Sequence, residues 1–189
     1  MRVRKCRGPI VASGMVLLIA AWAGADKALQ KHLTGTLPSG KEIAGWTVMP
    51  GSLVYGEGKG LTEIYDGGYR QYLDNGVAAA ARQVYQKSGM TADVVLHVMS
   101  SPAAGAKLAG IKRADFSPGT AQMLKTLPKG WGGFAVQDKG YAVSYVYSGK
   151  YLATVMVDGK QAKTATATEI AQKAVAKAVA ADKAAGKAR

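Results

Sequence analysis

The stretch from residue 134 to residue 157, FAVQDKGYAVSYVYSGKYLATVMV, contains three mostly apolar runs joined by two short turns. The runs span residues 134–137, 141–147 and 151–157, and each turn contains a glycine. Valine, tyrosine and phenylalanine favour extended chains, and short glycine turns between such runs are typical of antiparallel strands. These residues therefore predict a three-stranded antiparallel meander.

Further strands are expected before the meander. The valine-rich run 92–99 (ADVVLHVM) is the clearest of them, and residues 77–86 precede it. The short turn Lys87-Ser88-Gly89 between these two runs predicts a β-hairpin. Two shorter strands are expected at residues 45–49 and 53–55, where turn residues follow each run.

Helices are expected to pack on this sheet. Apolar residues that recur at steps of three and four indicate an amphipathic helix. A proline is favoured in the first turn of a helix, and the pattern Thr-x-x-Glu is a capping box that marks a helix start. The expected ranges are 61–73, 102–112 and a C-terminal helix from the box at Thr166 and Glu169, with one more helical turn at 121–125 in the loop 114–133. The predicted fold class is α+β: a single domain with a mainly antiparallel sheet and helices packed on it, including a C-terminal helix.

The first 25 residues have the layout of a secretory signal peptide. Basic residues without an acidic one come first, residues 10–21 are mostly apolar, and small residues favour cleavage after Ala25 or Ala23. The apolar run is shorter than the ~20 residues that a membrane-spanning helix needs, and an uncleaved anchor is the alternative. We therefore expect a signal peptide at 1–25, a single domain at 26–182 and a frayed basic tail at 183–189, in a protein exported to the periplasm or secreted.

Cysteine and charge constrain the exported part of the chain. Cys6 is the only cysteine, so cleavage would leave no disulfide and no thiolate metal site. Four of the 25 lysine and arginine residues lie within 1–25, so the remainder carries 21 basic and 12 acidic side chains, a net charge of +9. This charge favours an anionic envelope component or another envelope protein as partner, and no nucleic acid is expected outside the cell. A charged surface that serves solubility is the alternative.

No catalytic or metal-binding constellation stands out, and no cofactor is expected. The two histidines are His32 and His97, and neither has the ligand spacing of a metal site. His97 is expected to be a half-exposed strand residue. An enzyme of unknown class would have to use Glu63, Asp66 or His97 for acid–base chemistry.

Tyrosines suggest a contact surface, because a tyrosine buries a large ring and keeps a polar tip. The candidate binding residues are Tyr65, Asp66, Gly67, Gly68, Tyr69 and Tyr72, all on the expected helix 61–73. Its two glycines are expected either to allow close contact between the helix and the sheet or to let the backbone approach a ligand. The odd-numbered tyrosines at 141, 145, 147 and 151 would share one face of the meander if the turn preserved the register.

The chain resembles a family of exported bacterial proteins that is known as a domain of unknown function. The matching residues are Gly45-Trp46, the run LTEIYDGGYRQYL at 61–73, Gly76-Val77, Val98-Met99 and the alanine-rich stretch 103–109. Asp66 stands where the family usually has asparagine, and Tyr69 where it has a small residue. The resemblance implies export and an α+β fold.

These observations lead to one functional hypothesis and two alternatives. We expect an exported cell-envelope protein that acts as a non-catalytic binding or accessory module. The alternatives are an enzyme that uses acidic residues of the Gly-Gly helix, and a peripheral membrane or cell-wall protein held by its basic surface.

Overall fold

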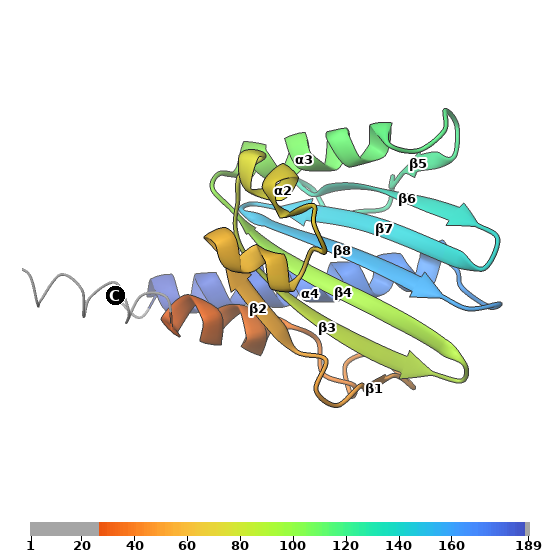
Figure 1. Cartoon of the computed structure of the whole chain (residues 1–189), viewed down its shortest axis with the longest axis horizontal. Coiled ribbons are helices and arrows are strands. Elements are labelled where there is room, and N and C mark those ends of the chain that lie inside the picture. The colour runs from red at the N-terminus through yellow and green to blue at the C-terminus, as the bar shows by residue number, and fades with distance from the viewer. Residues whose placement is uncertain (1–26, 188–189) are drawn as a thin grey trace, which may run out of the picture.

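The computed structural model describes residues 27–187, so the predicted signal peptide lies outside the described residues. Within that range eight strands form one antiparallel sheet in the order β1-β3-β4-β8-β7-β6-β5, with β2 also paired to β3 (Figure 1). The strands are β1 (Thr47–Val48), β2 (Val54–Glu57), β3 (Val77–Lys87), β4 (Met90–Met99), β5 (Ala121–Met123), β6 (Gly132–Asp138), β7 (Tyr141–Ser148) and β8 (Tyr151–Asp158). The helical elements are residues 27–36, η1 (Gly58–Glu63), α2 (Tyr69–Asp74), α3 (Pro102–Ala114) and α4 (Thr164–Lys187).

This arrangement confirms the predicted α+β fold with its antiparallel sheet and C-terminal helix. The meander β6-β7-β8 and the hairpin β3-β4 both form where the glycine turns predicted them. The two units join because β4 pairs with β8, from Thr91 opposite Asp158 to Val98 opposite Tyr151. That long-range pairing turns local hairpins into one continuous sheet.

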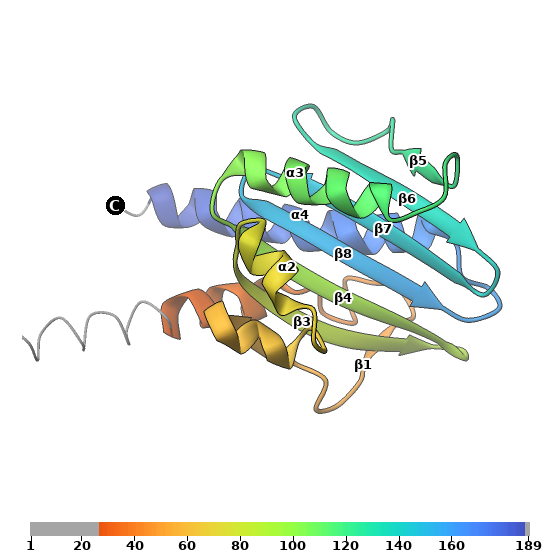
Figure 2. The same cartoon turned by 45° about the horizontal axis from the view of Figure 1, so that its top comes forward.

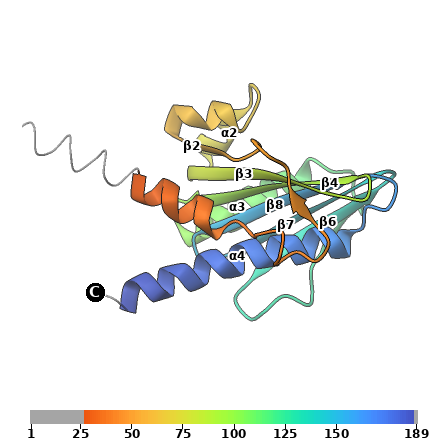
Figure 3. The same ribbon diagram turned by 90° about the horizontal axis from the view of Figure 1, so that it is seen from below.

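One face of the sheet is covered by α4 and by the helix of residues 27–36 (Figure 3). The buried side of α4 carries small side chains, including Ala167, Ala171, Ala174 and Ala178, which are all fully buried. Side chains this small let the helix lie close to the strands beneath it. The N-terminal helix is joined to this face by His32, whose Nε2 lies 2.8 Å from the hydroxyl of Tyr151 and 3.5 Å from a carboxylate oxygen of Asp182.

The opposite face is covered only in part. The elements η1, α2 and α3 lie over one end of the strands, while the end near the β3–β4 and β6–β7 turns has no helix in front of it (Figures 1 and 2). A second cluster of buried residues lies beneath these elements, including Leu61, Leu108 and Leu152. The uncovered part of this face is where a ligand can reach the sheet.

The predicted helix 61–73 is wrong as a single element. The chain forms the 3-10 helix η1, turns, and then forms the short helix α2. Gly67 has a φ of +73°, a left-handed conformation that interrupts a right-handed helix. A Cβ atom added at Gly67 or Gly68 would meet nothing within 4 Å, so the expected close contact of these glycines with the sheet is also wrong.

Three smaller expectations also fail. Residues 121–123 form the edge strand β5 and not a helical turn, because they pair with β6. The helix α4 begins at Thr164, so Thr166 lies inside its first turn and does not cap it. Tyr151 faces away from the other meander tyrosines, because it pairs with Ser148 across the turn and residues paired in this way share a face.

Candidate ligand-binding site

The uncovered half of the sheet presents rows of side chains that the strand register aligns. In one row Arg82 of β3 lies opposite Val95 of β4, Val95 opposite Thr154 of β8, and Thr154 opposite Tyr145 of β7. The next row toward the open end contains Asp93, Met156 and Val143. Because side chains two residues apart in a strand point to the same side, both rows face the same space and form its floor.

Two stacked tyrosines close one end of this floor. The rings of Tyr65 and Tyr72 lie 3.6 Å apart between centroids and are inclined by 8°. Tyr65 comes from the turn after η1 and Tyr72 from α2, so the segment that replaces the expected long helix brings both rings over the sheet. Each ring centroid is also about 6 Å from that of His97, at 6.0 Å for Tyr65 and 6.1 Å for Tyr72.

His97 lies beneath this pair and is buried, which corrects the expectation of a half-exposed histidine. Its Nδ1 is 2.8 Å from the carbonyl oxygen of Leu152. A carbonyl only accepts, so Nδ1 carries the proton and donates. Burial lowers the pKa of His97 to about 4, against the opposing effect of that hydrogen bond, so the ring is neutral at physiological pH.

The neutral ring leaves Nε2 of His97 as an acceptor, and the hydroxyl of Tyr65 donates to it. Burial of the Tyr65 phenol also raises its pKa well above the usual value, so the hydroxyl keeps its proton. His97 therefore fixes the position of Tyr65, and through it the end wall of the cavity.

A lysine of α3 holds the other tyrosine of the wall. The ammonium of Lys112 lies 4.9 Å from the ring centroid of Tyr72 and donates to Oε1 of Gln71 at 2.8 Å. A cation over an aromatic face is attracted by the ring's negative potential. These contacts join α2 to α3 and hold the ring of Tyr72 in place in the wall.

The open cavity bounded by this floor and wall has a volume of about 490 Å³. It is lined by Ile64, Tyr65, Tyr72, Arg82, Asp93, Val95, Phe116, Tyr141, Val143, Tyr145, Thr154 and Met156. Most of these side chains are apolar or aromatic, and a few polar groups are set among them. Cavities of roughly 300–1,000 Å³ with this composition are typical of small-molecule sites.

The charged groups among these lining residues are Arg82 and Asp93, and they form a bidentate ion pair. Nε of Arg82 donates to both carboxylate oxygens at 2.9 and 3.0 Å, and Nη2 donates to Oδ2 at 2.6 Å. Hydrogen bonding to Asp93 raises the pKa of the Arg82 guanidinium, which stays charged. The pair thus places a polar but electrically neutral group on an apolar floor.

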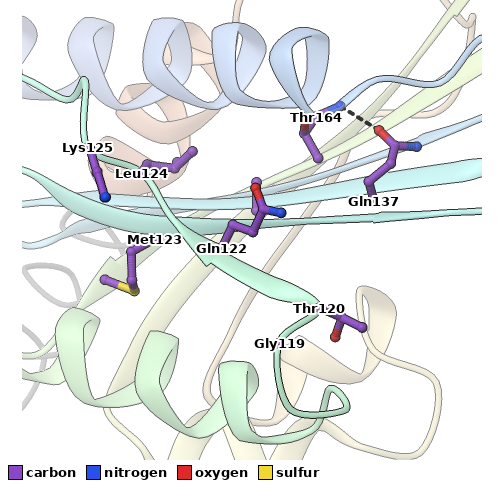
Figure 4. A pocket seen from close by; sticks show the side chains of 9 residues that line it. Gly119, Thr120, Gln122, Met123, Leu124, Lys125, Gln137 and Thr164 are labelled. Atoms are coloured by element: carbon purple, nitrogen blue, oxygen red, sulfur yellow. Dashed lines mark hydrogen bonds between the residues drawn. The ribbon is translucent and has the colours of Figure 1, made fainter.

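A larger hollow of about 650 Å³ lies at the edge strand β5, between residues 119–125 and the start of α4 (Figure 4). One of its polar side chains, Gln137, is already engaged in the fold. The side-chain amide of Gln137 accepts from the backbone N–H of Thr164 at 3.0 Å and donates to the carbonyl of Ala162 at 3.1 Å. Because this amide fixes the start of α4 and the hollow has no aromatic wall, we place the candidate site in the smaller cavity.

The structure brings together only part of the predicted binding surface. Tyr65 and Tyr72 line the cavity. Tyr69, the first residue of α2, is half-buried and packs against the second cluster of buried residues. Asp66, Gly67 and Gly68 are exposed in the turn before α2 and do not line it. The candidate acid–base residues do not meet either, because Glu63 and Asp66 are exposed and His97 is buried behind the wall.

Sequence reasoning missed the ion pair on the floor. Arg82 and Asp93 each place a charge in the interior of a strand of the predicted hairpin, and the register set by the turn puts both side chains on the same face of the sheet. Opposite charges on the same face of the two strands of a predicted hairpin are the signal that could have identified the pair. Across residues 27–187 no group of three or more histidine, cysteine or acidic residues is placed to hold a metal ion, and no helix there is both long and apolar enough to cross a membrane.

Comparisons with known proteins reveal similarity of fold. The sequence matches no protein-family model and no curated protein. Among solved structures, the chain is similar to the extracellular domain of PknH from Mycobacterium tuberculosis, with 12% sequence identity and a TM-score of 0.55 over 80% of this chain and 96% of that one. A GTP-binding regulator from Thermotoga maritima aligns over 78% of this chain and 87% of that one, at 11% identity and a TM-score of 0.42.

Proposed function

We propose that this chain is an exported, non-catalytic binding module of the cell envelope, and that the cavity on the open half of its sheet holds the ligand. The observation that carries the proposal is the cavity itself, an apolar floor closed by the Tyr65–Tyr72 wall. Its shape is maintained by the hydrogen bond to His97 and by the contacts of Lys112, so the site is formed before a ligand arrives. A preformed site loses little conformational entropy on binding.

Two observations support a location outside the cytoplasm. Residues 1–25 have the layout of a signal peptide, and the PknH domain with a similar fold is extracellular. A binding role is favoured over catalysis because the candidate acid–base residues Glu63, Asp66 and His97 do not line the cavity. Its polar groups are tyrosine and threonine hydroxyls and one neutralised ion pair, which suit recognition.

The test places a phenylalanine side chain in the cavity or in the larger hollow and compares how each variant binds a probe. Thr154 lies in the middle of the floor and Gln122 lies in the hollow beside β5. We expect the fluorescent apolar probe N-phenyl-1-naphthylamine to bind the purified protein, Thr154→Phe to weaken binding at least about tenfold by occupying the space, and Gln122→Phe to leave it unchanged. A probe that fails to bind, or that responds to Gln122→Phe and not to Thr154→Phe, would refute this assignment.

A further inference from the structure

The charge balance of the cavity restricts what it can hold. Among its lining residues, Arg82 supplies one positive and Asp93 one negative charge. In the bidentate contact the edge of the Arg82 guanidinium points at the Asp93 carboxylate. The carboxylate therefore compensates the positive charge of Arg82 at the surface of the cavity that a ligand would contact. An anion that entered would approach Arg82 and be repelled by Asp93 within the same few ångströms.

The rest of the cavity adds to this restriction. Val95, Val143 and Met156 of the floor and Phe116 at the side offer apolar contacts and no hydrogen-bond donor for a charged group. The hydroxyls of Thr154 and of the lining tyrosines replace only part of the hydration that a charge loses when it enters such surroundings. An uncharged apolar body, in contrast, gains from burial on this floor.

Hydrogen-bonding capacity remains for one uncharged polar group. Within residues 27–187, the Nη1 group of Arg82 hydrogen-bonds to no side chain, and the Asp93 carboxylate has lone pairs beyond the three bonds that it accepts. The hydroxyl of Tyr145 belongs to the same row of the floor as Arg82. A hydroxyl or amide group of a ligand can donate to the carboxylate and accept from Nη1 without disturbing the pair.

We infer that the cavity selects uncharged amphipathic molecules, with an apolar body and a hydroxyl or amide group, and that Asp93 excludes anions by neutralising Arg82. This inference rests on the proposed function, because it names the ligand class of the same site. It assigns to Asp93 a role in specificity that is separate from the affinity given by the apolar floor.

Two probes that share a ring system but differ in charge test the inference. N-phenyl-1-naphthylamine is uncharged, and 8-anilinonaphthalene-1-sulfonate carries a sulfonate on the same rings. We expect the wild-type protein to bind the uncharged probe about tenfold more tightly, because the sulfonate meets the Asp93 carboxylate. Fluorescence titration at fixed ionic strength gives both dissociation constants.

The variant Asp93→Asn keeps the shape of the side chain and leaves the Arg82 charge uncompensated. We expect it to bind the sulfonate probe about tenfold more tightly than the wild type does, so that the preference for the uncharged probe is lost. Glu169→Gln is the matched control, because it makes the same change in net charge at an exposed position of α4, on the opposite face of the sheet. This control should keep the wild-type ratio of the two dissociation constants.

The outcomes separate the inference from the proposed function. Equal or tighter binding of the sulfonate probe by the wild type would overturn the ligand class, while binding itself would stand. An unchanged ratio in Asp93→Asn would overturn the role of Asp93. The variant Arg82→Gln leaves the Asp93 carboxylate uncompensated and serves if Asp93→Asn does not fold; it should strengthen the preference for the uncharged probe, and an unchanged ratio there would also overturn the role of Asp93. Failure of both probes to bind the wild type would refute the proposed function and the inference with it.

Discussion

The hydrogen bond between Tyr65 and His97 offers a sharp test of the site's architecture. In Tyr65→Phe the ring and its stacking on Tyr72 remain, but Nε2 of His97 loses its donor. His97 is only 1% exposed, so water does not replace that donor freely. Leaving a buried polar group unsatisfied costs about 1–3 kcal/mol, and this is the loss in free energy of unfolding that we expect.

Urea denaturation followed by circular dichroism measures this loss directly. A loss of about 2 kcal/mol corresponds to a fall in Tm of roughly 4–8 °C for a domain of this size. Tyr141→Phe is the matched control, because its hydroxyl donates to Asp138 at an exposed position, and we expect a change within about 0.5 kcal/mol. If Tyr65→Phe is as stable as this control, His97 does not accept a hydrogen bond from Tyr65 and the account of the wall is wrong.

Three further predictions follow from burial, backbone geometry and the N-terminal pattern. The pKa of His97 is lowered from 6.5 to about 4 in the folded protein, so between pH 6.5 and pH 4 the unfolded chain binds a proton that the folded protein does not. The free energy of unfolding should therefore fall by on the order of 3 kcal/mol as the pH drops from 6.5 to 4. A free energy of unfolding that does not change with pH, measured by urea denaturation, would contradict a buried neutral ring. Gly67→Ala should destabilise the protein by about 1 kcal/mol because the left-handed φ of Gly67 disfavours a Cβ atom, whereas Gly68→Ala, at φ −102°, should be near neutral; equal melting temperatures for the two variants would refute the turn geometry. The protein isolated from its native host should begin at Asp26 or Gly24, and N-terminal sequencing that finds residues 1–22 retained would favour an uncleaved anchor over a signal peptide.

Local signals in the sequence account for the sheet. Glycine turns and runs of valine and tyrosine act over a few residues, so the meander and the hairpin β3-β4 were predictable from the chain alone. The helix 61–73 was not, because its apolar spacing is helical while Gly67 favours a left-handed turn. In the structure the turn prevails, since the break lets Tyr65 and Tyr72 stack over the sheet.

The site was harder to predict because its parts come from distant segments. The burial of His97 depends on a segment some thirty residues earlier folding over β4, since Tyr65 and His97 are separated by 32 positions. The alternation of residues within β4 gives no sign that another segment covers His97. The Arg82–Asp93 pair, in contrast, spans a single predicted hairpin, and its register depends only on the turn between the strands.

The most direct test of the central claim is to locate the bound probe by NMR. Amide chemical shifts of the purified protein would be recorded during titration with N-phenyl-1-naphthylamine. We predict that the largest changes occur at Val95, Thr154 and Tyr145, on the floor of the cavity. Changes concentrated at Gln122 and Thr164, beside β5, would contradict the claim and assign binding to the larger hollow.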